Sequence, residues 1–202
     1  MKQQNLAKKL VMIVEQVLVA SSSDKSKKYF LDFLSAHAVK MLSSVSTGGE
    51  ARRAVMQHNF QLVVINAPLR DEFGHELAMD LAEKTNVGVV LVVKSELYET
   101  VSDRVEQAGV IVVQKPINRM LLYQSMRIAA ACGQRLETLQ KENQKLQKKM
   151  HELQLVGRAK CALVQYRHLT EQEAHRYIEK QAMNQRVPRL EIAEDILHTY
   201  DD

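Results

Sequence analysis

The sequence predicts an α/β protein in three parts: a domain built on a five-stranded parallel sheet, a long coiled-coil helix, and a small three-helix domain. Three observations lead to this prediction. Short β-branched runs alternate with amphipathic stretches over residues 1–128, an apolar seven-residue repeat follows over residues 129–155, and three short helical patterns occupy residues 156–202. We therefore expect two domains joined by one helix.

The first domain contains five short runs rich in valine, leucine and isoleucine, which we interpret as strands. They begin at Gln16, Val39, Phe60, Val87 and Val110. The amphipathic stretches that follow them predict helices beginning near Asp24, Gly49, Glu72, Glu96 and Arg119. This alternation is typical of a parallel sheet with helices on both faces. Because ligands bind such sheets at the carboxyl ends of the strands, the residues after each strand are the candidate site.

The residues after the predicted strands carry few charges. They are Ser21, Ser22 and Ser23 after the first strand, Asn66 after the third, Lys94 and Ser95 after the fourth, and Lys115 with Pro116 after the fifth. The arrangement resembles the receiver domain of bacterial response regulators over most of residues 15–128, which implies a flavodoxin-like fold. That family has two acidic residues after the first strand for Mg²⁺, a phosphorylated aspartate after the third, a hydroxyl residue after the fourth and a Lys-Pro pair after the fifth. Only Lys115 and Pro116 keep this pattern clearly, with Ser95 or Lys94 near the hydroxyl position.

The departures from the receiver pattern predict a pseudo-receiver that is not phosphorylated in the usual way. Ser21 and Ser22 carry no charge, whereas a Mg²⁺ site needs charged oxygen ligands to compensate for dehydration of the ion. Asn66 lacks the carboxylate that would form an acyl phosphate. We therefore expect no cofactor and no enzymatic activity. Lys115 could still donate a hydrogen bond to Asn66, a structural role that we favour over a retained anion site.

Other polar residues of this domain are expected to serve the fold. Asp24 and Asp71 are placed to cap the first and third helices, with Glu72 in the first turn of the third, where acidic residues are favoured. His58 and His75 lie on predicted helices without a partner at ligand spacing, so we expect them to be exposed to solvent.

The linking segment has the apolar spacing of a two-stranded coiled coil. The predicted seam consists of Leu136, Leu139, Asn143, Leu146, Met150 and Leu153. A single seam asparagine such as Asn143 fixes register and favours a parallel dimer. The pattern predicts one helix from about Arg119 to Tyr166, interrupted only mildly by Gly133 and roughly 70 Å long at 1.5 Å per residue. The alternative is an amphipathic helix that packs on its own chain.

Two cysteines lie on this predicted helix, and both are expected to be reduced thiols in a cytoplasmic protein. Cys132 and Cys161 are 29 residues apart on one helix, too far to bridge within a chain. Across a parallel dimer Cys132 would sit at a seam position, where an intersubunit disulfide could form on oxidation, although we favour a small buried core residue.

Three helical patterns follow to the end of the chain. The first is the end of the long helix. Thr170 and Glu173 form a capping-box signature, so the second helix begins at Glu171 and ends near Asn184. Pro188 suits the first position of the third helix. Because this domain is too small to be robust alone, we expect the dimeric helix to support it.

Basic residues gather in this half of the chain. Residues 141–189 contain eleven Lys and Arg against five Asp and Glu. The candidate RNA-binding residues are Lys160, Arg167, His175, Arg176, Lys180, Arg186 and Arg189. Hairpin loops are recognised by phosphate contacts together with stacking and edge contacts to splayed bases, which this set could supply.

The same segment resembles a known RNA-binding module. The resemblance is to the ANTAR domain of transcription antitermination regulators, and it is carried by Ala159 and Lys160, Leu169 and Thr170, Glu173 and Ala174, Arg176, Ala182 and Met183, Arg186, and Leu190 through Ala193. It implies binding to tandem small-loop hairpins in nascent RNA that compete with a terminator. One departure is His175, where the family commonly carries Tyr or Phe.

These observations predict a cytoplasmic, homodimeric, non-enzymatic transcription antitermination regulator that binds RNA hairpin loops. A regulatory protein or a small-molecule ligand would replace phosphorylation as the signal. The alternatives are a DNA-binding response-regulator-like factor, since three small helices with a basic turn also describe a helix-turn-helix unit, and a protein-interaction scaffold. No membrane partner is expected. The apolar run over residues 10–14 lacks the features of a signal peptide.

Overall fold

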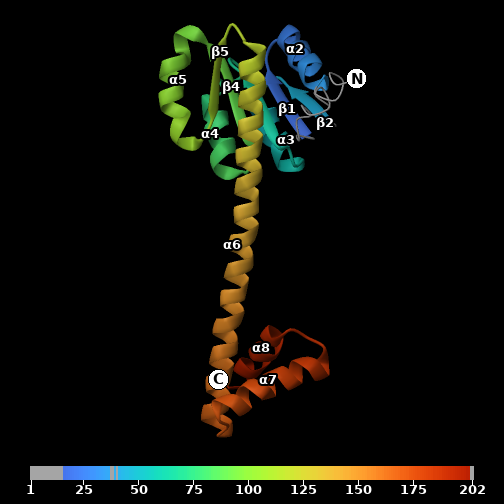
Figure 1. The fold of residues 1–202 in the computed structure, drawn as a ribbon, viewed down its shortest axis with the longest axis vertical. Coiled ribbons are helices and arrows are strands. Elements are labelled where there is room, and N and C mark those ends of the chain that lie inside the picture. The colour runs from blue at the N-terminus through green and yellow to red at the C-terminus, as the bar shows by residue number, and fades with distance from the viewer. Residues whose placement is uncertain (1–15, 37–38, 40, 201–202) are drawn as a thin grey trace, which may run out of the picture. The chain divides into compact units, whose positions relative to one another are not determined.

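A computed structural model describes residues 16–36, 39 and 41–200, apart from the side chain of Met41. The apolar run over residues 10–14 lies outside the described residues. The chain divides into two compact units, one ending at Thr138 and the other beginning at Leu139 (Figure 1). Each unit is described by itself below.

The N-terminal unit is built on a five-stranded parallel sheet, as the sequence predicts. Its strands are β1 (Gln16–Ser21), β2 (Met41–Val45), β3 (Leu62–Asn66), β4 (Gly88–Lys94) and β5 (Ile111–Lys115), in the spatial order β2-β1-β3-β4-β5. All four neighbouring pairs are parallel. From β1 the chain adds β2 on one side of the sheet and β3, β4 and β5 on the other. The carboxyl ends of β1 and β3 therefore form the topological switch point, where ligands bind in sheets of this kind. In register, Ser21 lies opposite Asn66, and Lys94 lies opposite Lys115.

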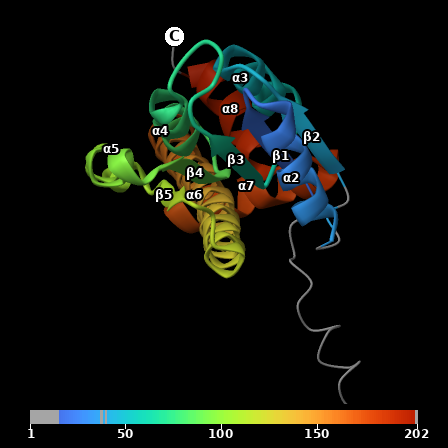
Figure 2. The same cartoon turned by 90° about the horizontal axis from the view of Figure 1, so that it is seen from above.

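Helices cover both faces of this sheet because the strand residues are apolar on both sides. The helices before the long one are α2 (Asp24–Ser35), α3 (Gly48–Gln57), α4 (His75–Lys84) and α5 (Tyr98–Val105), with short 3₁₀ turns at Ser95–Leu97 and Glu106–Ala108. On one face α2 and the first turns of α6 share a buried cluster with alternate strand residues. On the other face α3, α4 and α5 pack on the remaining strand residues. Figure 2 shows the sheet between α3 and α4 on one side and α6 on the other.

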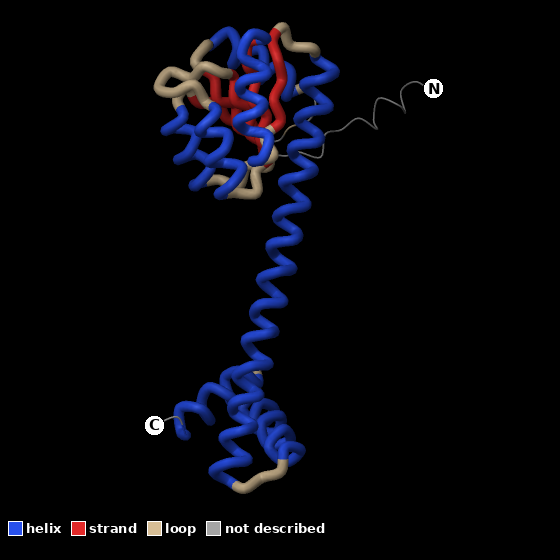
Figure 3. The backbone as a smooth tube through the Cα atoms, turned by 90° about the vertical axis from the view of Figure 1, so that its left-hand side faces the viewer, coloured by secondary structure: helices blue, strands red, loops and turns tan. Residues whose placement is uncertain are grey.

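The long helix α6 runs from Arg119 to Arg167 without a break, as predicted (Figure 3). Asn118 caps it, because its side-chain oxygen accepts hydrogen bonds from the backbone N–H groups of Met120 and Leu121. Gly133 has a specific packing role. A Cβ added there would lie 2.3 Å from the carbonyl oxygen of Asn86, and one added at Gly88 would lie 2.4 Å from the backbone of Ala129. These two glycines let the helix and the start of β4 approach backbone to backbone.

Two predicted helix caps are wrong. The residue that caps α2 is Ser23, whose hydroxyl accepts a hydrogen bond from the backbone of Ser26, and Asp24 lies in the first turn instead. The second is Asp71, which was expected to cap a helix beginning at Glu72. That helix begins at His75, after Gly74 in a left-handed conformation. Its start is delayed because the preceding loop is bonded to another helix.

That loop is held by acidic residues that bond to α3. The carboxylate of Asp71 accepts hydrogen bonds from the backbone N–H groups of Gly48, at 2.8 Å, and Gly49, at 3.1 Å. These bonds lower the pKa of Asp71, because the ionised form is the better acceptor. Glu72 forms a salt bridge with Arg52, which also pairs with Asp80 at 3.0 Å. Asp71 therefore caps α3 from a distance in sequence.

The C-terminal unit comprises the end of α6 with α7 (Glu171–Gln185) and α8 (Arg189–Tyr200) (Figure 3). The predicted capping box is confirmed: Thr170 N–H donates to the Glu173 carboxylate at 2.9 Å, and Glu173 N–H donates to the Thr170 hydroxyl at 3.3 Å. Its core is formed by Val156, Ala159, Leu163, Ala174, Ile178, Ala182, Ile192, Ala193, Ile196 and Leu197.

Candidate functional sites

The first candidate site lies at the carboxyl ends of the strands. Ser21 and Asn66 are both buried there, and the Asn66 amide donates a hydrogen bond to the Ser21 hydroxyl at 2.9 Å. The Ser21 hydroxyl in turn faces the carbonyl oxygen of Ser23 at 3.5 Å. The two residues at the positions of an acidic ligand and of the phosphoacceptor are therefore bonded to each other.

Lys115 bonds to the backbone of Ala67 and not to Asn66, the partner that the sequence suggests. Its amino group donates a hydrogen bond to the carbonyl oxygen of Ala67 at 2.8 Å, so the bond to Asn66 is not formed. Partial burial lowers the pKa of Lys115, and the charge of its neighbour Lys94 lowers the pKa further. This lysine has a neutral backbone partner in place of a carboxylate.

The two hydroxyls nearby are also bonded to the backbone. Ser22 donates to the carbonyl oxygen of Pro68 at 2.7 Å, and Ser95 donates to the carbonyl oxygen of Lys115. Within the described part of the chain, no three His, Cys, Asp or Glu side chains gather as a metal site would require. The polar groups at this edge join loops to one another, and nothing in their arrangement supplies a nucleophilic carboxylate.

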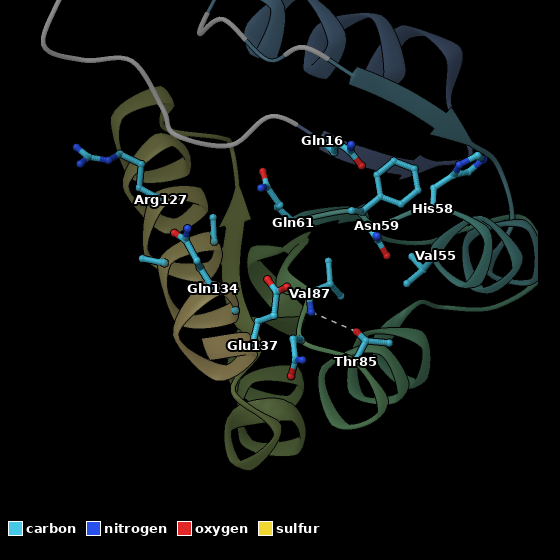
Figure 4. A pocket seen from close by; sticks show the side chains of 15 residues that line it. Gln16, Val55, His58, Asn59, Gln61, Thr85, Val87, Arg127, Gln134 and Glu137 are labelled. Carbon is cyan, nitrogen blue, oxygen red and sulfur yellow. Dashed lines mark hydrogen bonds between the residues drawn. The ribbon is translucent and has the colours of Figure 1, made fainter. Parts of the chain in front are cut away.

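A hollow lies at the other end of the same sheet (Figure 4). Its volume is about 600 Å³, and its lining includes the amides of Asn59, Gln61 and Gln134. Gln134 and Glu137 reach it from α6, and Val87 N–H donates to the Thr85 hydroxyl at 3.3 Å on the opposite wall (Figure 4). Sequence reasoning directed attention to the carboxyl ends of the strands and missed this hollow.

The second candidate site lies on the C-terminal unit, where three predicted RNA-binding residues come together. Lys160 from α6 and His175 and Arg176 from α7 line a shallow hollow with Glu171 and Gln172. Lys160 donates to the Glu171 carboxylate at 2.8 Å, and this bond lowers the pKa of Glu171. Because such surface ion pairs contribute only about 0–1 kcal/mol, a phosphate can compete for Lys160.

The predicted residues differ in whether their side chains are bonded within the unit. Arg167 and Arg189 are engaged within the unit: Arg167 donates to the hydroxyls of Tyr200 and Tyr177, and Arg189 pairs with Glu152 at 3.5 Å and lies 3.7 Å from Glu179. His175 lies 3.3 Å from the same Glu179.

By contrast, Arg176, Lys180 and Arg186 are exposed. Their side chains form no hydrogen bond or salt bridge with any other described residue. Arg176 and Lys180 lie one turn apart on α7, and Arg186 ends that helix with a φ of 59°. We call these three residues the free cations; they are the part of the predicted set that is available to a phosphate without breaking an ion pair.

The predicted seam of α6 is exposed along its length. Leu136, Leu139, Leu146, Met150 and Leu153 are between 50% and 67% exposed. The alternative of a helix that packs on its own chain therefore finds no support among the described residues. Exposed Leu121 and Ile128, seven residues apart, add apolar positions to the same helix. Cys132 is exposed as well, so its favoured interpretation as a small buried core residue is wrong.

Known proteins resemble this chain in both units. The model of the ANTAR domain family matches residues 144–197. The transcriptional regulatory protein PdtaR of Mycobacterium tuberculosis is 23% identical over 189 residues, which cover 93% of this chain and 91% of that protein. The aliphatic amidase regulator of Pseudomonas aeruginosa is 26% identical over 136 residues, which cover 67% of this chain and 69% of that regulator.

Among solved structures, the signal receiver domain of an HD domain-containing protein from Pseudomonas fluorescens Pf-5 matches with a TM-score of 0.56 at 14% identity. The match covers 62% of this chain and 93% of that domain, and it shows the receiver fold. The chain therefore combines an N-terminal domain of the receiver fold with a C-terminal segment that matches the ANTAR domain, and it is similar over most of its length to a transcriptional regulator.

Within residues 16–36, 39 and 41–200, no helix is both long enough and apolar enough to cross a bilayer.

Proposed function

We propose that this regulator binds hairpin loops in nascent RNA as a homodimer and acts in transcription antitermination. The observation that carries the proposal is the set of free cations, Arg176, Lys180 and Arg186, exposed on a domain of the ANTAR family. RNA loops present phosphates and unstacked bases, and exposed guanidinium and ammonium groups bind both. Lys160 and His175 extend the same surface.

The exposed seam of α6 supports the homodimer. Large apolar side chains that recur every three and four residues on a solvent-exposed helix face are costly unless a partner covers them. A second copy of the chain presents the same face in the same register, and Asn143 favours a parallel pair. Two RNA-binding domains joined in this way would bind two hairpins with a gain from effective concentration.

Phosphorylation of an aspartate is not part of this proposal. Asn66 and Ser21 bond to each other, and Lys115 bonds to the backbone of Ala67, so the strand-end site holds its loops together. We propose that the protein is not an enzyme and that a regulatory protein or a small molecule delivers the signal to the N-terminal domain.

The test is to crosslink the full-length protein to RNA in its host and to sequence the recovered fragments. The proposal expects enrichment of transcript leaders that fold into closely spaced hairpins, and binding in vitro that is lost when the loop sequence is changed with the stem intact. Preference for duplex DNA of the same sequence would favour a DNA-binding factor. Recovery of a protein partner without nucleic acid would favour a scaffold, and either result would overturn the proposal.

A further inference from the structure

The C-terminal unit contains an aromatic cluster that includes none of the free cations. It includes three of the six tyrosines of the chain: Tyr177 and Tyr200 bond to Arg167, and Tyr166 stacks on Tyr200. Tyr166 and Tyr200 are stacked, with ring centroids 5.1 Å apart and an angle of 7° between the ring planes. They come from the last turns of α6 and α8, so the stack joins the ends of two helices.

Arg167 fixes the other rings of the cluster. Its Nε–H donates to the Tyr200 hydroxyl at 2.7 Å, and one of its terminal N–H groups donates to the Tyr177 hydroxyl at 3.2 Å. The guanidinium carbon lies 5.3 Å from the centroid of the Tyr177 ring. Because both hydroxyls accept from Arg167, their own O–H protons remain available as donors.

Tyr166 remains open to solvent despite this order. Its side chain is 53% exposed and lies outside the apolar core, whereas Tyr200 and Tyr177 are packed against that core. One face of the Tyr166 ring stacks on Tyr200, and the ring is otherwise exposed, so a second planar group can stack on it. Leu163, three residues earlier on α6, supplies the packing that anchors the helix, so burial does not explain Tyr166.

We propose that Tyr166 is a stacking platform for one unpaired nucleobase of the bound RNA. This inference rests on the proposed function and adds a binding residue to it. Base stacking on an aromatic ring contributes about 1–3 kcal/mol and tolerates any base. The site takes an unpaired base because a paired base is already stacked in its helix and cannot reach the ring. Tyr200 supports the platform from behind, and Arg167 holds Tyr200.

The platform would supply an aromatic contact of the kind that the departure at His175 removes. The family resemblance places an aromatic residue there, and an imidazole that lies 3.3 Å from Glu179 is a weaker stacking surface. Tyr166 lies on α6, the helix that also carries Lys160. The platform therefore provides stacking by a ring that is fixed in the free protein, which limits the ordering cost of binding.

The experiment uses the full-length protein and a hairpin RNA recovered by crosslinking, in which the loop nucleotides are replaced one at a time by 5-iodouridine. Irradiation is expected to crosslink the loop to the peptide that contains Tyr166. Substitution Tyr166→Leu is expected to weaken binding by about tenfold, within the range that one stacked base contributes. Tyr166→Phe keeps the ring and is expected to bind within about twofold of the wild type.

Two controls separate the platform from its alternatives. An RNA with an abasic residue at the crosslinked position should bind Tyr166→Leu and the wild type equally. If Tyr166 served only the structure of the domain, its replacement by leucine would weaken binding of the abasic RNA and of the intact RNA alike. Arg176→Ala tests the proposed function by itself. If it weakens binding while Tyr166→Leu does not, the platform is overturned and the RNA-binding surface stands. If neither substitution changes binding, both proposals are overturned.

Discussion

Lysine and arginine occur at both candidate sites, but their surroundings differ. At the strand ends Lys115 is half-buried and donates to a backbone carbonyl, and the neighbouring serines bond to carbonyls as well. On α7, Arg176 and Lys180 are exposed and form no ion pair with any described residue. The comparison teaches that an exposed cation outside any ion pair is a better candidate for a binding surface than a half-buried lysine that is bonded to the backbone.

The largest expected effect concerns phosphorylation of the strand-end site. Incubation with acetyl phosphate and Mg²⁺ should leave the protein unlabelled, while a competent receiver domain in the same reaction becomes labelled. Asn66→Asp should also remain unlabelled, because Ser21 and Ser22 provide no charge for the metal ion. Stable labelling of the wild type that disappears in Asn66→Ala would show that the site is chemically active after all.

The second prediction contrasts two glycines of α6. Gly133→Ala should destabilise the N-terminal unit by about 1–3 kcal/mol, because the added Cβ would meet the backbone of β4. Gly157→Ala should stabilise the C-terminal unit by up to about 1 kcal/mol, since nothing lies within 4 Å of that position and alanine is the better helix former. Thermal unfolding followed by circular dichroism measures both. Equal effects of the two changes would refute the proposed close approach of helix and sheet.

The third prediction tests whether the exposed seam is a dimer interface. Asn143→Leu should strengthen the dimer and admit other oligomers, because an apolar seam no longer requires the in-register parallel pair. Sedimentation equilibrium over a range of protein concentrations gives the association constant. A protein that is monomeric before and after the change would remove the coiled coil from this account.

The smallest expected effect comes from releasing a cation that is paired in the free protein. Glu171→Gln removes the carboxylate that binds Lys160, so RNA affinity should rise about two- to fivefold, in keeping with the small free energy of exposed ion pairs. The effect should vanish in the double variant Glu171→Gln with Lys160→Ala. An unchanged or lower affinity in Glu171→Gln would mean that Lys160 serves only the fold.

Local patterns in the sequence were enough to predict most of the fold. The β-branched runs mark the five strands, and Thr170 with Glu173 marks the start of α7, because each signal involves neighbours in the chain. Contacts between distant residues could not be predicted in this way. Asp71 fits the pattern of a cap for the next helix, but it bonds to Gly48, which lies 23 residues away.

The candidate sites divide in the same manner. The missing charges at Ser21, Ser22 and Asn66 are visible in the sequence, whereas the partner of Lys115 depends on how the loop after β3 folds. Composition identified the basic character of the C-terminal unit. It could not tell which cations are paired, because Lys160 and Glu171 come together only when α6 and α7 pack. The sequence held one indication of the cluster around Arg167: three of the six tyrosines of the chain lie within residues 166–200.

The central claim is that RNA affinity resides in the free cations, and the salt dependence of binding tests it most directly. For a hairpin RNA recovered by crosslinking, each phosphate contact contributes about −0.7 to the slope of log K against log salt. Arg176→Ala and Lys180→Ala should each weaken binding and flatten the slope by about that amount. Lys28→Ala, which removes one exposed positive charge from the N-terminal unit, should leave the slope unchanged. If Arg176→Ala and Lys180→Ala bind the RNA no worse than Lys28→Ala does, the claim is contradicted.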